Sequence, residues 1–277
     1  MAISTRDAII DGLGNNNNRI LWDKASVPTQ VVGQYCSLWR ATGVPAVGSI
    51  PAAAAYCTKA LTGAIGFDNQ TAPATSYLAY HSLLCGTANT NLEIHDRLAH
   101  MGGLNATLLT AQTVGIDLST INAGGAVPAA RLGDANYSDV SWFLEWYTAT
   151  GSTASNATVA VTYDDGSTGN LAAIAIGGTS IAASQMRQLV PAVNGRFIRG
   201  VVSVTLSAST GTAGSFGVTA TRQRASMSTA IANKVEVFDW AQLGFPEIPN
   251  DACLAGILMS TATASGTIKG QGKIVHG

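Results

Sequence analysis

Charged side chains are scarce in this chain. Asp, Glu, Lys and Arg make up 11% of its 277 residues, whereas an ordinary soluble domain carries about 25%. The net charge is −1, and the chain lacks the basic patch that nucleic-acid binding requires. Its one local pair of basic residues, Arg222 and Arg224, is explained as the solvated edge of a strand or an interface pair. We therefore expect no nucleic-acid partner.

Long hydrophobic runs are absent as well. A membrane-spanning helix needs about 20 mostly apolar residues, and the best apolar runs, Leu171–Ile176 and Leu254–Met259, are far shorter. The polar N-terminus lacks the apolar region of a signal peptide, so we expect synthesis in a reducing cytoplasm and no membrane partner. Disorder goes with low hydrophobicity, and this chain is 47% hydrophobic. The composition favours a folded protein that covers part of its surface with copies of itself or with partners.

No two cysteines have the spacing of a zinc or redox motif, because no CxxC pair occurs. Thiols stay free in a reducing cytoplasm, and we interpret these as small buried hydrophobic residues. A disulfide formed after release from a cell is the alternative. The four residues are Cys36, Cys57, Cys85 and Cys253.

Two groups of polar residues have the residue types of a metal or calcium site, but the spacing of each group is wrong for such a site. His95 and His100 are five residues apart, which places them on a common face of neither a helix nor a strand, and Asp96 points away from His95 on a strand. We interpret these three as surface or interface residues. Asp164 and Asp165 are adjacent, whereas a calcium loop needs alternate oxygen ligands. A hairpin turn explains both.

Candidate catalytic residues are equally isolated. His81 and Cys85 share a strand face but lack an orienting acid, so a core thiol is favoured. Glu145, between Trp142 and Trp146, is the best hint of a glycosidase or a sugar-binding face, yet hydrolysis needs a second acid and none is assigned. No GxSxG elbow or phosphate loop is present. We predict a protein that is not an enzyme and that holds no cofactor or metal.

Short alternating segments dominate what is present. Ser141–Ile176 is typical of two adjacent β-hairpins, and about ten short strands separated by turn clusters predict an antiparallel β-sandwich or jelly roll. The segment 179–190 is the exception, and we expect a short helix there. The last two strands, within 254–265 and 267–275, are expected to pair with each other.

Residues 1–60 follow a different pattern from residues 61–277. A short helix is predicted near the start, with Ser4 or Thr5 as its N-cap, and a run of four asparagines then breaks it. Three prolines and scattered apolar residues follow without a clean period. We predict an irregular, partly extended N-terminal arm on a β-sandwich body, with a sub-boundary of the body near residue 135.

The arm carries large apolar residues that need burial. Burial on the body of this chain and burial on a neighbouring molecule are both open. We expect the arm to lie across a neighbour, and we expect the body to fold without residues 1–40. The predicted interface residues are Trp22, Trp39, Leu38 and Tyr35.

Three blocks of sequence carry a resemblance to a known family. They are QYCSLWRATGVPAVGSIP (34–51), LEIHDRLAHMGGLNATLLTAQTVGIDL (92–118) and LEWYTATGSTASNATVAVTYDDGSTG (144–169). Together they resemble structural proteins encoded by tailed bacteriophages and prophages, such as capsid decoration proteins. The motifs have no catalytic meaning, so the resemblance transfers no functional residues.

The resemblance implies a virion structural protein made in the bacterial host cytoplasm. A decoration or cement protein of this kind binds the major capsid protein on the outside of a phage head, and we expect a symmetric homo-oligomer, a trimer. The alternative is a tail, neck or receptor-binding module that recognises a glycan. The enzyme alternative requires two convergent acids or a histidine-led site. A major shell subunit is disfavoured by analogy, because the pattern contains no long helix.

Overall fold

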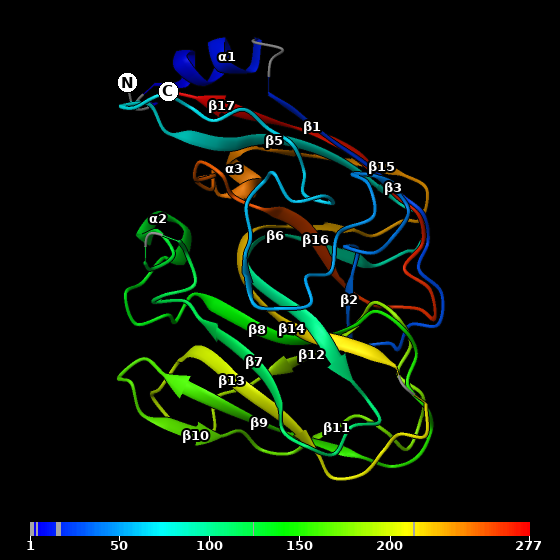
Figure 1. Cartoon of the computed structure of the whole chain (residues 1–277). Coiled ribbons are helices and arrows are strands. Elements are labelled where there is room, and N and C mark those ends of the chain that lie inside the picture. Colours follow the sequence, from blue (N-terminus) through cyan, green and yellow to red (C-terminus); the bar gives the residue numbers. More distant parts are fainter. Residues whose placement is uncertain (1–2, 4, 15–17, 124, 213) are drawn as a thin grey trace. The chain divides into compact units, whose positions relative to one another are not determined.

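The computed structural model describes residues 3, 5–14, 18–123, 125–212 and 214–277. Over these residues the chain consists of antiparallel strands and three short helices (Figure 1). The predicted all-β class is confirmed. The chain forms two compact units, and each is described by itself. Unit 1 comprises Met1–Ser49, Thr58–Asp96 and Gln223–Gly277, and unit 2 comprises Ile50–Cys57 and Arg97–Arg222.

Unit 1 contains a complete five-stranded antiparallel sheet. In its strand RILWDK, residues at even positions are buried and those at odd positions are exposed, as a half-buried strand requires. The C-terminal strand lies between the N-terminal strand and a strand from residues 76–85 (Figure 1). The order is β15 (Val235–Asp239), β5 (Ser76–Cys85), β17 (Ile268–His276), β1 (Arg19–Lys24) and β3 (Gly43–Val44).

A second layer of unit 1 packs against this sheet. It contains β2 (Tyr35–Ser37), β16 (Leu254–Met259) and the first part of β6 (Thr90–Asn105), with β16 in the middle. Apolar side chains from both layers form one buried cluster, which includes Ile20, Leu83, Leu92 and Leu258. Unit 1 is therefore a two-layer β-sandwich.

Unit 2 repeats the two-layer plan around its own core, which contains Trp142, Trp146, Val161 and Val204. One sheet has the order β10 (Thr168–Asn170), β9 (Asn156–Tyr163), β13 (Ile198–Leu206) and β7 (Gln112–Asp117), and β11 (Ile174–Ala175) also pairs with β9. The other layer pairs β8 (Val140–Trp146) with β12 (Gln185–Leu189) and with the first half of β14 (Ser215–Thr229), and pairs β4 (Ala55–Tyr56) with the later part of β6.

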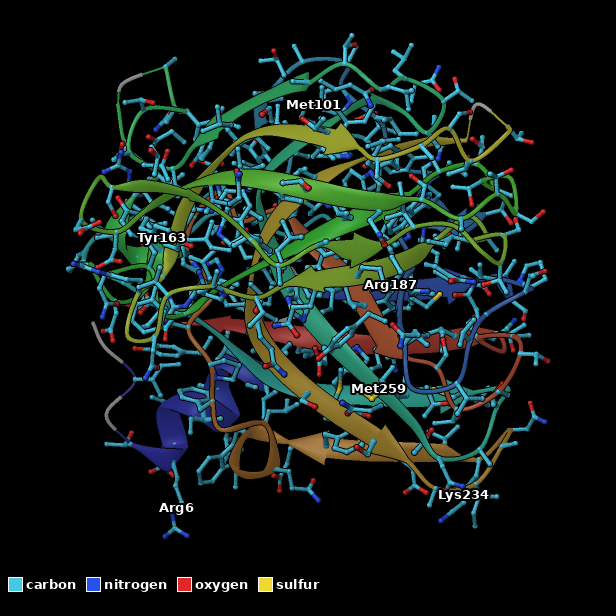
Figure 2. All side chains as sticks on the ribbon, turned by 90° about the horizontal axis from the view of Figure 1, so that it is seen from below. Arg6, Met101, Tyr163, Arg187, Lys234 and Met259 are labelled. Atoms are coloured by element: carbon cyan, nitrogen blue, oxygen red, sulfur yellow. The ribbon has the colours of Figure 1, made fainter. Side chains whose placement is uncertain are left out.

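The helices are short. They are α1 (Arg6–Gly14), α2 (Ala129–Leu132) and α3 (Trp240–Leu243). Thr5 accepts a hydrogen bond from the amide of Ala8 at 3.2 Å, as expected of an N-cap. The other predicted cap, Ser4, and asparagines 15–17 lie outside the described residues. Arg6 of α1 projects away from the helix (Figure 2). None of the described helices has the length and apolar character of a membrane span.

The structure differs from the predicted arm and body. Residues 19–24 form an interior strand between β17 and β3, and residues 1–49 belong to unit 1. Removing residues 1–40 therefore removes β1 and β2 from both layers of unit 1 and would not leave an intact body. Residue 135 lies inside unit 2, and the chain crosses between units at 49/50, 57/58, 96/97 and 222/223. The local sequence does not show that β1 pairs with a strand about 250 residues later.

Two local predictions are also wrong. The segment 179–190 contains β12 rather than a helix, because pairing with β8 satisfies its backbone and buries Met186 and Leu189. The last two strands do not pair with each other: β16 pairs with β2 and β6, and β17 pairs with β1 and β5.

Candidate functional site

The central part of β6 carries three of the polar residues that the sequence offered for chemistry, His95, Asp96 and His100, and all three are buried. The side chain of Asp96 accepts hydrogen bonds from the Cys253 amide at 2.9 Å and from Arg224 at 3.3 Å. His95 Nε2 lies 2.8 Å from a carboxylate oxygen of Glu93. These contacts lie within unit 1. The prediction that His95 and Asp96 are surface or interface residues is wrong, because both faces of β6 are covered here by this chain itself.

An ion pair lies at the centre of unit 2. Arg97 donates to both carboxylate oxygens of Glu145, at 2.8 and 3.0 Å, and Thr219 donates to the same carboxylate at 2.7 Å. Both charged side chains are at most 1% exposed. Burial lowers the pKa of Arg97, but the adjacent Glu145 carboxylate outweighs it, so the pKa lies above its ordinary value. Glu145 therefore neutralises a buried cation and does not face a substrate.

His100 and Tyr147 complete the polar interior of unit 2. The ring nitrogen Nε2 of His100 contacts the Tyr147 hydroxyl, and the two ring centroids lie 5.6 Å apart. Burial, together with the positive charge of Arg97, lowers the pKa of His100 to about 3. Burial, together with Glu145, raises the pKa of Tyr147. Both groups are neutral at pH 7, and His100 is a core residue rather than the predicted surface residue.

Two further cations are buried that the sequence did not single out. Arg131 of α2 donates to the Tyr56 hydroxyl at 2.7 Å and to the carbonyls of Cys57 and Arg97 at 2.8 and 3.1 Å. Lys24 of β1 donates to the carbonyls of Ala41 and Pro45, and burial lowers its pKa to about 8. The alternation in RILWDK could have predicted this burial, because it places Lys24 on the same strand face as Ile20 and Trp22.

The remaining candidate groups are structural. All four cysteines are free and buried, and burial raises the pKa of the Cys85 thiol; the core-thiol interpretation is confirmed. Asp164 and Asp165 lie in the turn after β9, where Asp165 accepts from the amide and hydroxyl of Ser167. The hairpin-turn interpretation is confirmed. Over the described residues, no group of three His, Cys, Asp or Glu side chains is placed to hold a metal ion.

The predicted interface residues lie mostly inside unit 1. Trp22 is 4% exposed and Trp39 is 1% exposed. The indole of Trp39 donates to the Ser49 carbonyl at 2.8 Å, and Leu38 is buried in the same core as Trp22. Tyr35 is half-buried on β2. Three of these four side chains therefore stabilise their own chain, because β1 and the segment after β2 pack into the sandwich.

The surface of unit 1 instead carries other apolar residues, which were not among the predicted interface residues. Val31, Val32 and Met259 are exposed, and a hydrogen bond of 2.8 Å from the Gly33 amide to the Ser260 carbonyl holds their two segments together. We call these three residues the aliphatic tip of unit 1. The feature of the sequence that could have indicated them is the pair of adjacent valines before Gly33, in a segment that shows neither helical nor strand periodicity.

The outer face of the five-stranded sheet in unit 1 is also partly apolar. Leu21, Val44, Val235 and Val237 are exposed there. They occupy positions at which an alternating strand normally carries polar residues. Lys234, just before β15, extends outward from the same unit (Figure 2).

Comparison with known proteins shows only distant structural likeness. No family model and no curated protein matches this chain. A subviral particle of infectious bursal disease virus VP2 matches with 10% identity and a TM-score of 0.20, covering 94% of this chain and 79% of that chain. The Gt strain of the same virus gives 10% identity and a TM-score of 0.16, covering 93% and 80%. Likeness at this level does not place the chain in a family.

Proposed function

We propose that this chain is a structural component of a virion: a decoration protein on the outside of a tailed-phage head. In this role it binds the major capsid protein and stabilises the shell through contacts between subunits. The proposal draws on the sequence blocks 34–51, 92–118 and 144–169, which resemble phage structural proteins, and on the all-β architecture. The virion is then its location, after synthesis in the bacterial cytoplasm.

The observation that carries the proposal is the exposed aliphatic surface of unit 1. Val32 is 62% exposed and follows Val31 in sequence, and Met259 is exposed on the segment that the Gly33–Ser260 hydrogen bond joins to theirs. Contiguous exposed apolar side chains on a soluble protein mark surfaces that a partner covers, and burial of apolar area stabilises such a contact by about 25 cal/mol per Å² before ordering losses. In a chain with 11% charged residues, few charges oppose the removal of water from this surface.

We also propose that the chain is not an enzyme. The acid–base groups on β6 and β8 are engaged inside the two units: Asp96 with Arg224, Glu145 with Arg97, and His100 with Tyr147. A general acid or base must lie within reach of a substrate proton, and these groups are buried from solvent. The interior network is better explained as a device that holds each sandwich in one register.

The test is a particle-binding experiment. Phage heads that lack this chain are mixed with the purified protein, and the bound copies are counted by cryo-electron microscopy. We expect many copies at symmetry-related positions on the shell. Replacing the aliphatic tip (Val31→Ser, Val32→Ser and Met259→Gln together) should weaken binding, whereas the matched control Val202→Thr, an exposed valine of unit 2, should not.

The outcome separates the alternatives. A few copies at the neck or tail would overturn the decoration role and favour the tail or receptor-binding alternative. Loss of binding only in the Val202→Thr control would assign the contact to unit 2. The expected homo-oligomer, a trimer, is tested by light scattering of the purified protein, and a monomer at high concentration would contradict it.

A further inference from the structure

Two adjacent leucines are exposed on a loop of unit 2. Leu108 is 48% exposed and Leu109 is 53% exposed, and both lie in the segment 106–111 that joins β6 to β7. We call residues 106–111 the leucine loop. No Asp, Glu, Lys, Arg or His occurs between residues 101 and 116, so the loop offers a partner apolar contacts without any charge.

Hydrogen bonds at its base hold the leucine loop in one conformation. The Asn105 amide donates to the Gln112 side chain at 2.7 Å, and that side chain donates back to the Asn105 carbonyl at 2.9 Å. The Asn105 side chain accepts from the amide and the hydroxyl of Thr107, at 2.9 and 2.8 Å. A loop that is already ordered loses little conformational entropy when it binds, so Leu108 and Leu109 are preorganised for contact.

Unit 2 also contains an apolar hollow. It has a volume of about 230 Å³ and is formed by the start of β8, the end of β12 with the residues after it, and the start of β13. Its walls include Val140, Trp142, Val190 and Phe197. The Trp142 indole donates to the Ile198 carbonyl at 2.8 Å, which fixes the ring in place. The described residues that line the hollow include no charged side chain.

The leucine loop and the hollow lie at opposite ends of unit 2. Ile198, the first residue of β13, lines the hollow. Val204 of the same strand pairs with Gln112, the residue that follows the leucine loop, and β7 and β13 lie side by side (Figure 1). At about 3.3 Å per residue, the two features are about 20 Å apart along the strand. The loop therefore cannot reach the hollow of its own unit.

We propose that the leucine loop of one copy inserts into the hollow of the next, so that copies of this chain associate head to tail through unit 2. A hollow of this size has room for several water molecules, and an apolar side chain that displaces poorly ordered water gains affinity. Two complementary surfaces at different places on one molecule give a heterologous contact, which closes into a ring or continues as a filament. A ring of three copies would be the homo-oligomer expected above.

The surroundings of the hollow favour an uncharged occupant. Asp139, just before β8, pairs with Arg222 at 3.1 Å, and Arg196, two residues before β13, pairs with Asp165 at 2.7 Å. Both neighbouring charges are neutralised within their own chain, so a charged occupant gains nothing from them. A membrane is disfavoured as the partner of the loop, because surface-binding segments carry basic and aromatic residues and the leucine loop has neither. A second copy supplies both an uncharged loop and an uncharged hollow.

The experiment is sedimentation velocity of the purified full chain over a range of concentrations, without phage heads. The loop variant is Leu108→Ser with Leu109→Ser. The hollow variant is Val190→Glu, at a position that is 65% exposed. The matched control is Val193→Glu, an exposed valine that does not line the hollow. A second control is the aliphatic-tip variant used for particle binding. All the replaced side chains are exposed, so each protein should fold, and thermal unfolding verifies this.

We expect the native chain to form assemblies of three or more copies as its concentration rises. The loop and hollow variants should each self-associate at least about tenfold more weakly, whereas both controls should associate like the native chain. An equal mixture of the loop and hollow variants should form dimers only, because such a pair retains one intact loop and one intact hollow.

Three results would each overturn the proposal. They are a native chain that stays monomeric or stops at a dimer, a loop or hollow variant that associates like the native chain, and an equal mixture that does not dimerise. Loss of association in the aliphatic-tip variant alone would also overturn it, by placing the contact on unit 1. The inference goes beyond the decoration role and does not depend on it, because the assay contains no phage heads and the head-binding experiment tests that role separately.

Discussion

The buried ion pair of unit 2 provides the sharpest test of this structure. Glu145→Gln keeps the shape of the side chain but removes its charge. In the native chain Arg97 donates two hydrogen bonds, of 2.8 and 3.0 Å, to the Glu145 carboxylate. In the variant Arg97 stays buried, but its acceptor is a neutral amide. Thr219, which donates to the same group at 2.7 Å, also loses its charged acceptor. The substitution therefore leaves an uncompensated cation in the core.

The expected loss is large because both side chains are at most 1% exposed. Removing one partner of a buried pair costs about 3–5 kcal/mol, against a total stability of about 5–15 kcal/mol for a domain. At about 2–4 °C per kcal/mol, the melting temperature should fall by about 6–20 °C. Replacing the whole group (Arg97→Met, Glu145→Leu and Thr219→Val together) should cost far less, because no buried charge is then left unpaired.

The assay is urea unfolding followed by circular dichroism, arranged as a double-mutant cycle on Arg97 and Glu145. The control is Arg196→Gln, which breaks the exposed pair that Arg196 forms with Asp165 at 2.7 Å and should cost under about 1 kcal/mol. The reasoning is refuted if Glu145→Gln costs no more than the control, or if the two single substitutions are additive.

Three further predictions follow from the buried groups. Burial lowers the pKa of His81 to about 4 and that of His100 to about 3, from about 6.5 in the unfolded chain. As the pH falls, the unfolded chain therefore takes up protons before the folded chain does. The contribution of these histidines to stability is complete above pH 6.5 and decreases by about 2 kcal/mol per histidine at pH 5. Urea unfolding midpoints measured at pH 5 and pH 8 test this, and equal midpoints would contradict it. Gly256→Ala would place a Cβ 2.8 Å from the Trp22 ring, and we expect a loss of about 1–3 kcal/mol measured by thermal unfolding, with Gly14→Ala as the control in open space. The four thiols should react with a thiol reagent only on unfolding, because all are buried; rapid modification of the native chain would show that the core opens.

The sequence by itself determined the class of fold and most of its strands. The alternation in 198–206 and the turn residues after Tyr163 predicted β13 and the hairpin that ends β9, and the structure contains both. The free, buried state of the cysteines also followed from spacing and composition. These features depend on local periodicity and on turn chemistry, which are written in neighbouring residues.

Only the tertiary structure decided which residues are interior and which are available to partners. Trp22 and Trp39 looked like residues of an arm, yet β1 pairs with β17 across nearly the whole chain and buries them. His95 and Glu145 looked like surface residues or candidate site residues, yet both faces of β6 and β8 are covered. Tyr80, Lys273 and Arg19 are far apart in sequence but lie next to one another across β5, β17 and β1, and only the register of these three strands brings them together. The sequence could not show this because burial depends on pairing between distant strands. The two-residue alternation of a strand assigns each side chain to one face of a sheet, but it does not say what covers that face.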